Sequence, residues 1–318
     1  MRILLVKTSS LGDVVHNLPV VDDILSHHPG ARVDWLVEES FVDIPRLHPG
    51  VDRTIPVAIR RWRKRLLSPR TWQEIAAFRR MLRAERYACV IDTQGLLKSG
   101  LLVAQARLIG GGRRCGHGAR SAKEPLCARF YDDRHDVSRS LHAVERNRML
   151  VAACLGYAVD TPLSYGLAAP GLVADWLPHA PHAVLLTATS RDDKLWPEDN
   201  WVALGKALAA DGLVCVLPAG NVIERERAQR IACAIPGALP APPLDIAALA
   251  GLLAGSRRVI GVDTGLTHLA AALGVPTTAI YSATDPRLTG VHAGTQAINL
   301  GSAENAPGVS SVLAAGDG

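Results

Sequence analysis

Asp263, Thr264 and Gly265 form a turn whose residue types and position suit phosphate binding. The apolar residues 259–262 before them predict a short buried strand, and residues 266–273 after them predict a helix. The first amide groups of a helix have no intrahelical partner and attract anions, and a glycine lets a phosphate come close to the backbone. We therefore expect an anion site here, although an aspartate directly before a helix often serves only as its N-cap.

Two further polar loops follow predicted strands in the first half of the chain. Residues 9–13 follow the apolar run 3–6, and residues 92–95 follow the run 89–91. Strands that alternate with helices predict a mostly parallel, doubly wound sheet, and the loops after its strands form the ligand-binding edge. These two loops should therefore open on one crevice, and a helix is expected over about residues 14–28.

The chain of 318 residues is long enough for two domains of ordinary size. Between Gly156 and Pro181 the sequence becomes proline-rich and loses its periodicity, which predicts a domain junction there. We expect an N-terminal domain of residues 1–165 and a C-terminal domain of residues 166–318. Neither first strand is followed by G-x-G-x-x-G, and no P-loop motif occurs, so dinucleotide oxidoreductases and P-loop enzymes are poor candidates.

The composition indicates a globular protein with an anionic partner. Hydrophobic residues make up 48% of the chain and charged residues 20%, and the net charge is +5. The basic, aromatic-interleaved motifs of nucleic-acid modules are absent, so no nucleic-acid partner is expected. Six scattered cysteines without a C-x-x-C pair indicate reduced cytosolic thiols. The N-terminus predicts a strand and no apolar run is long enough to span a bilayer, so we expect a cytoplasmic protein with peripheral membrane contact.

Seven motifs, in this order, carry a resemblance to a known family. They are KTSSLGDVVHNLP (7–19), RRWRK (60–64), DTQGLLKS (92–99), EPL (124–126), HAVERNR (142–148), TSRDDKLWP (189–197) and DTGLTHLAAALGVP (263–276). Together they resemble the bacterial ADP-heptose:lipopolysaccharide heptosyltransferases. The motifs RRWRK, DTQGLLKS and HAVERNR are most similar to the heptosyltransferase I branch of that family.

The resemblance implies an α/β fold of GT-B architecture, with two facing Rossmann-like doubly wound domains. It implies an inverting transfer of L-glycero-D-manno-heptose from ADP-heptose to the Kdo of lipid A, in lipopolysaccharide inner-core biosynthesis. No metal and no other cofactor is implied. The expected partners are ADP-heptose, Kdo-lipid A and, through peripheral contact, the anionic cytoplasmic face of the inner membrane.

The C-terminal domain is expected to bind the donor. The residues that the resemblance assigns to ADP-heptose are Thr189, Ser190, Lys194, Glu224, Leu244, Asp263, Thr264, Gly265, Leu266 and His268. Lys194 is expected to be catalytic because it can stabilise the charge on the departing diphosphate. Glu224 is placed at the ribose hydroxyls, although an acid that begins a helix can simply complement the helix dipole. Leu244 is placed at the adenine, although it could equally be ordinary core.

The N-terminal domain is expected to bind the acceptor. The assigned residues are Ser10, Gly12, Arg60, Arg61, Arg63, Lys64, Gln94 and Lys123. Lys123 stands where the family pattern has arginine, and a lysine cannot form the bidentate fork. The basic run could alternatively be a solvated charge cluster. Asp13 is expected to be the general base, on the face opposite the leaving diphosphate, although it could instead cap the helix beginning at Val14.

Three other functions are compatible with parts of this pattern. Heptosyltransferase II shares the chemistry but takes a heptose acceptor. A nucleotide-sugar 2-epimerase uses two such domains without any acceptor. A non-catalytic nucleotide-binding module would need neither an acid at position 13 nor the basic run, and this sequence has both.

Overall fold

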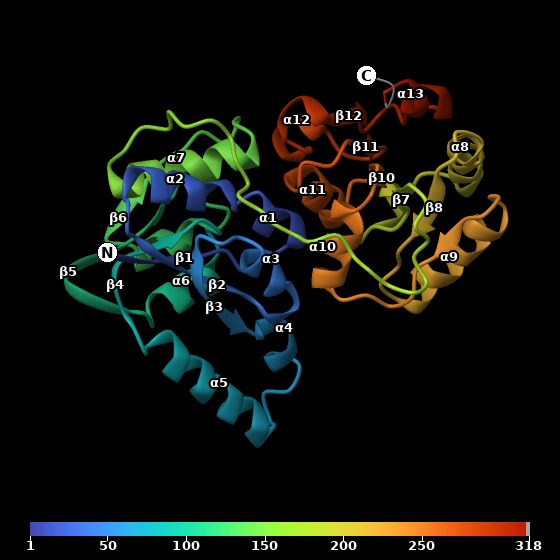
Figure 1. Cartoon of the computed structure of the whole chain (residues 1–318). Helices are drawn as coiled ribbons and strands as arrows, with labels where there is room; N and C mark the ends of the chain where they lie inside the picture. Colours follow the sequence, from blue (N-terminus) through green and yellow to red (C-terminus); the bar gives the residue numbers. More distant parts are fainter. Residues whose placement is uncertain (316–318) are drawn as a thin grey trace. The chain divides into compact units, whose positions relative to one another are not determined.

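The computed structural model describes residues 1–315, and the chain divides into two compact units, Met1–Gly166 and Leu167–Gly318 (Figure 1). We call them unit 1 and unit 2. Each unit is built on one six-stranded sheet, and every strand pairing in both sheets is parallel. Each is therefore an α/β unit of the expected doubly wound kind. Among residues 1–315, no helix is long and apolar enough to cross a membrane.

The sheet of unit 1 has the strand order β3-β2-β1-β4-β5-β6. Its strands are β1 (Arg2–Val6), β2 (Arg32–Glu38), β3 (Val51–Val57), β4 (Arg86–Asp92), β5 (Arg107–His117) and β6 (Asp133–His135). The central strands β1 and β4 read as nearly continuous apolar runs because helices cover both faces of a parallel sheet. The loops after β1 and β4, which are neighbours, therefore emerge at the same edge.

The helices of unit 1 differ from the prediction near the N-terminus. They are α1 (Leu11–Val15), α2 (Pro19–His27), α3 (Asp43–Arg46), α4 (Ile59–Trp62), α5 (Pro69–Leu82), α6 (Leu97–Val103) and α7 (Ala143–Leu155), with 3-10 turns η1 (Glu39–Phe41) and η2 (Pro125–Phe130). The single helix expected over residues 14–28 is wrong. Pro19 lacks an amide hydrogen and cannot donate to a carbonyl of the preceding turn, so the helical hydrogen bonds are interrupted there and a new helix starts.

The sheet of unit 2 has the order β12-β11-β10-β7-β8-β9. Its strands are β7 (His182–Leu186), β8 (Val214–Leu217), β9 (Leu239–Pro240), β10 (Arg258–Val262), β11 (Thr277–Tyr281) and β12 (Ala297–Gly301). Its helices are α8 (Glu198–Ala210), α9 (Val222–Cys233), α10 (Ile246–Ala254), α11 (Gly265–Ala272), α12 (Pro286–Thr289) and α13 (Val309–Ala314), with η3 (Asp192–Lys194) and η4 (Gly294–Gln296). The strand, turn and helix expected around residues 259–273 are thus β10 and α11.

A buried ion pair joins two helices of unit 1 that lie side by side, α2 and α7 (Figure 1). Arg148 Nε donates to Asp23 Oδ2 at 2.8 Å, and its Nη2 donates to Asp23 Oδ1 at 3.0 Å. The two side chains are only 5% and 3% exposed. Arg148 Nη2 also donates to the Thr161 carbonyl at 2.7 Å, so the same guanidinium holds the segment that follows α7.

We predict that Arg148→Ala lowers the free energy of unfolding of unit 1 by about 3–5 kcal/mol, because Asp23 would keep a buried charge without a partner. Arg120→Ala is the control, since Arg120 and Asp136 form an ion pair whose side chains are 89% and 39% exposed. That change should cost at most about 1 kcal/mol. Urea unfolding followed by hydrogen exchange in β1 and β4 measures both, and equal losses would contradict the assigned role of the Arg148 pair.

Candidate functional site

The loops after β7 and β10 bring Lys194 and Asp263 together in unit 2. These strands are neighbours in the sheet, so their carboxyl ends share one edge. Lys194 Nζ, at the end of η3, donates to Asp263 Oδ2 at 2.6 Å, and the two side chains are 16% and 14% exposed. Thr189 Oγ1 donates to the Asp263 carbonyl at 2.9 Å. Residues separated by about seventy positions in sequence are thus fixed to one another.

Asp263 is the centre of this cluster and is not a helix cap. Thr264 occupies the N-cap position of α11, so the capping alternative for Asp263 is wrong. Thr284 Oγ1 donates to Asp263 Oδ2 at 2.7 Å, and His268 Nε2 lies 3.8 Å from Oδ1. Burial alone would raise the pKa of Asp263, but His268, Lys194 and Thr284 hold that pKa well below its ordinary value. The carboxylate is therefore ionised and orients the Lys194 ammonium.

A cavity of about 230 Å³ lies beside this cluster in unit 2. Its walls are Leu186, Ala188, Thr189, Ser190, Pro218, Ala219, Gly220, Glu224, Pro242, Leu244, Leu249, Thr264 and Leu266. Six of the ten residues expected at the donor are among them: Thr189, Ser190, Glu224, Leu244, Thr264 and Leu266. The other four do not line the cavity: Lys194, Asp263, Gly265 and His268. They adjoin two residues that do, because Thr189 donates to the Asp263 carbonyl and Thr264 is the N-cap of α11, which contains Gly265 and His268. Mostly apolar walls with a few polar groups suit a nucleoside.

Glu224 lies in the first turn of α9 and lines this cavity. Its Oε2 accepts from the Gly220 amide at 2.8 Å and its Oε1 from Asn221 Nδ2 at 2.7 Å. Asn221, the N-cap of α9, accepts in turn from the Glu224 amide at 2.9 Å. The helix-terminal role weighed for Glu224 therefore holds, and it leaves the carboxylate beside the cavity, where a diol could reach it.

Asp13 of unit 1 is held by a reciprocal cap at the start of α1. This helix begins at Leu11 rather than at Val14, with Ser10 as its N-cap. Asp13 Oδ2 accepts from the Ser10 amide at 2.9 Å and from Ser10 Oγ at 3.0 Å. Ser-x-x-Asp here acts as a capping box, a pattern known from Ser-x-x-Glu. Asp13 Oδ1 faces Lys123, whose Nζ lies 3.8 Å away.

The charges around Asp13 are mostly positive. Asp13 lines a cavity of about 70 Å³ together with Lys7, Thr93, Gln94, His117, Ser121, Lys123, Arg139, Ala143, Arg146 and Asn147. Burial alone would raise the pKa of Asp13, but Lys7, Lys123 and the Ser10 hydrogen bonds lower it below its ordinary value. Burial also lowers the pKa of Lys7 to about 8, and burial with the surrounding cations lowers the pKa of His117 to about 3. His117 is therefore neutral, and the cavity holds four basic groups and one carboxylate.

Buried polar side chains fix the loops of this cavity. Gln94 Oε1 accepts from the amides of Thr8 at 2.9 Å and Ser9 at 3.1 Å, so its oxygen holds the loop after β1. Lys7 Nζ donates to the Thr93 carbonyl at 2.8 Å and to Asn147 Oδ1 at 3.4 Å. The loops after β1 and β4 are thereby joined to each other and to α7.

Sequence reasoning found Asp13, Gln94 and Lys123 of this cavity and missed most of its other residues. Lys7, Arg146 and Asn147 stand inside the motifs KTSSLGD and HAVERNR, so the motifs themselves were the signal. Arg139, His117 and Ser121 lie outside every motif and carried none. Ser10 and Gly12 belong to the Asp13 turn but do not line the cavity.

The basic run RRWRK lies apart from this cavity, on α4 and the residues after it. Arg61 contacts Glu39 at 2.9 Å and Glu74 at 2.5 Å, so its charge is already compensated within the fold. The expectation that Arg61 offers its charge to an acceptor is therefore not supported by its contacts. The Arg60 guanidinium lies 5.2 Å from the centroid of the Phe41 ring. Arg63 and Lys64 are exposed and form no ion pair within residues 1–315.

Comparison with known proteins identifies the family. The model of glycosyltransferase family 9 (heptosyltransferase) matches residues 75–313. The chain is 44% identical over 306 residues to lipopolysaccharide heptosyltransferase 1 of Escherichia coli strain K12, across 96% of this chain and 95% of that protein. The structure of E. coli heptosyltransferase WaaC with ADP has a TM-score of 0.89 at 40% identity, across 99% of this chain and 98% of that chain.

A second solved structure, of E. coli heptosyltransferase WaaC with ADP-2-deoxy-2-fluoro heptose, has a TM-score of 0.83 at 41% identity. It covers 94% of this chain and 93% of that chain. The family match spans most of the chain, and the similarity in sequence and structure spans nearly all of it. This chain belongs to glycosyltransferase family 9, the heptosyltransferase family, and is a glycosyltransferase of GT-B architecture.

Proposed function

We propose that this glycosyltransferase moves L-glycero-D-manno-heptose from ADP-heptose to the Kdo of lipid A, with inversion, as heptosyltransferase I does. The sequence identity with a protein named lipopolysaccharide heptosyltransferase 1 supports this activity. The observation that carries the chemistry is Asp13, a carboxylate kept ionised among four basic groups at the edge of the unit 1 sheet. That environment suits a base that deprotonates a hydroxyl on an anionic sugar.

Unit 2 binds the donor in this proposal. The apolar walls of its cavity, with Leu244 among them, hold the adenine, and Glu224 accepts from the ribose hydroxyls. The first amides of α11, at Gly265 and Leu266, bind the diphosphate, as helix N-termini do. The two similar structures of E. coli heptosyltransferase WaaC, one with ADP and one with ADP-2-deoxy-2-fluoro heptose, support this ligand class.

The transfer needs one proton acceptor and one group that stabilises the leaving diphosphate. Asp13 removes the proton from the Kdo hydroxyl. At the same time the oxygen of that hydroxyl forms a bond to the anomeric carbon of the heptose. The bond from that carbon to the diphosphate oxygen breaks, and ADP leaves with the electron pair. Lys194, oriented by Asp263, stabilises the negative charge that grows on the diphosphate. No step requires a metal or another cofactor.

The acceptor side is selected by charge. Lys123, with Arg139 and Arg146 beside it in the Asp13 cavity, binds the carboxylate of Kdo. Arg60, Arg63 and Lys64 bind the lipid A phosphates. Lys123 acts as a point charge in this role, because a lysine cannot form the two-pronged contact of an arginine. We place the enzyme in the cytoplasm with peripheral contact to the inner membrane, where its acceptor lies.

The experiment that tests this function is a transfer assay with three conditions: ADP-heptose with Kdo-lipid A, with the already heptosylated core, and with no acceptor. Heptosyltransferase I activity predicts ADP release and a heptosylated product with Kdo-lipid A alone. Release only with the heptosylated core would instead show heptosyltransferase II activity. Conversion of the nucleotide sugar without any acceptor would show an epimerase.

We predict that Lys194→Ala lowers turnover on the order of a hundredfold, the scale of one positioned electrostatic group at a site of developing charge. Lys206→Ala on α8 is the matched control, because Lys206 is exposed and lies outside the site. Turnover and ADP-heptose affinity are measured together with the melting temperature, because the change also leaves Asp263 without its ammonium partner. Normal turnover with only weaker ADP-heptose binding would contradict a catalytic role for Lys194.

A further inference from the structure

Positive charge is concentrated in one short stretch of unit 1. Residues 60–83 contain nine Arg or Lys and one Glu, a net charge of +8. The whole chain has 35 basic and 30 acidic residues, so the rest of it has 26 against 29, a net charge of −3. The positive excess of the protein therefore lies entirely in α4, α5 and the loop between them.

Most of these cations have no acidic partner. Glu74, the single acid of the stretch, is already in contact with Arg61 and Arg70. Seven of the nine basic residues of this stretch are exposed and form no ion pair with the described part of the chain: Arg60, Arg63, Lys64, Arg65, Arg79, Arg80 and Arg83. Uncompensated charge of one sign produces a positive field over this surface and attracts an anionic partner.

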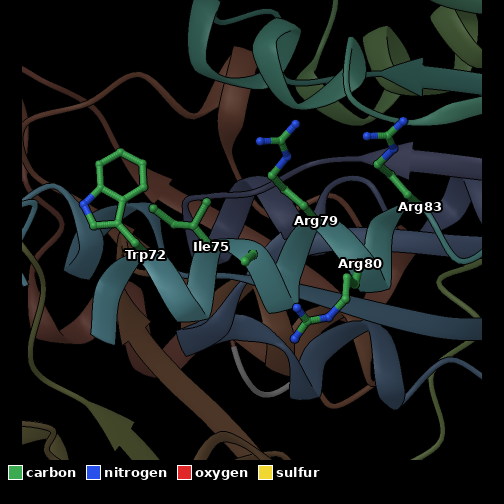
Figure 2. A pocket seen from close by; sticks show the side chains of 6 residues that line it. Trp72, Ile75, Arg79, Arg80 and Arg83 are labelled. Atoms are coloured by element: carbon green, nitrogen blue, oxygen red, sulfur yellow. The ribbon is translucent and has the colours of Figure 1, made fainter. Parts of the chain in front are cut away.

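The outer side of α5 forms a groove of about 590 Å³ lined by Trp72, Ile75, Ala76, Arg79, Arg80 and Arg83. We call these six residues the α5 face. In Figure 2, Trp72, Ile75, Arg79 and Arg83 project to the same side of the helix, and Arg80 points to another side. Phe78 and Leu82, which are 5% and 0% exposed, anchor α5 in the core of unit 1, and Ile75 packs against the same core. The helix is thus fixed to the core, and the other five residues of the face remain exposed.

Large apolar side chains stand beside these arginines. Trp72 is 59% exposed, and Leu66 and Leu67 in the loop before α5 are 52% and 99% exposed. Trp72 Nε1 donates to the Leu66 carbonyl at 2.8 Å, so the ring is fixed to that loop. Exposed tryptophan and leucine beside Arg and Lys are characteristic of elements that lie in a bilayer interface.

We propose that the α5 face, with Leu66 and Leu67, docks on the surface of an anionic lipid bilayer. The apolar side chains enter the headgroup region, and Arg79 and Arg83 contact lipid phosphates. A single-stranded nucleic acid fits less well, because the face has one aromatic ring and no succession of rings on which bases could stack. The proposal rests on the proposed function, which gives the enzyme an acceptor in a membrane, and it assigns the contact to a surface outside both cavities.

Co-sedimentation with vesicles tests this assignment. The probes are vesicles of phosphatidylcholine alone and of phosphatidylcholine with phosphatidylglycerol. The protein should bind only the second kind, and added salt should release it. Arg79→Gln with Arg83→Gln should weaken that binding about thirtyfold, from the effect of each basic residue near an anionic surface. Lys206→Gln with Arg257→Gln in unit 2 removes the same charge from exposed positions outside the face and should change it little.

Trp72→Ala separates the apolar part of the contact, because it leaves the charge unchanged and should still weaken binding. Equal losses in the two double variants would overturn the proposal, as would binding to a single-stranded RNA without binding to the vesicles.

A water-soluble, deacylated Kdo acceptor separates this result from the proposed function. The Arg79→Gln, Arg83→Gln variant should transfer heptose normally to that acceptor and more slowly to Kdo-lipid A in vesicles. Failure of the unmodified protein on both acceptors would contradict the function, whereas equal rates of variant and unmodified protein on vesicles would contradict only the docking face.

Discussion

A carboxylate kept ionised among like-charged cations is the constraint on which unit 1 depends. Asp13 faces Lys7 and Lys123, and Arg139 and Arg146 line the same cavity. Basic groups this close repel one another, and burial lowers the pKa of Lys7 and of Arg146 and so further disfavours their charged forms. The fold offsets this by fixing Lys7 on the Thr93 carbonyl and Asn147 and by keeping His117 neutral. Asp13 then supplies the negative charge that the cluster lacks, and an anionic acceptor can supply more.

In unit 2 the charges are arranged differently, because a single cation is paired with a single carboxylate. Here one ammonium, that of Lys194, is held by one carboxylate, that of Asp263, which Thr284 and His268 also contact. The net charge of this pair is near zero. A diphosphate bound here would contact the Lys194 ammonium, which Asp263 orients, and the amides at the start of α11. Both arrangements sit where loops leave the carboxyl ends of neighbouring parallel strands, β1 with β4 and β7 with β10. The two parallel sheets thus determine where the charges can gather.

Much of this could be predicted from the sequence, because apolar runs and polar turns are local signals. The strands around residues 3–6, 89–91 and 259–262, and the turns after them, follow directly from such runs. The start of α1 at Leu11 was missed because Asp13 was considered as the cap of a helix beginning at Val14. In the structure Ser10 is the N-cap and Asp13, three residues later, accepts from the Ser10 amide. The compensation of Arg61 was also missed, since Glu39 and Glu74 lie 22 and 13 positions away and only the fold brings them near. A basic run on its own says nothing about which of its charges are free.

The turnover of the Asp13→Asn variant tests the role of the Asp13 cavity most directly. Asparagine retains an oxygen that can accept from the Ser10 amide, so the melting transition should change by no more than about 1 kcal/mol in the free energy of unfolding. ADP-heptose affinity should also remain normal, because its proposed cavity lies in unit 2. Asparagine cannot take up the proton, so turnover on Kdo-lipid A should fall roughly 10²–10⁴-fold. A variant that folds, binds ADP-heptose and still turns over at a near wild-type rate would show that Asp13 is only a helix cap.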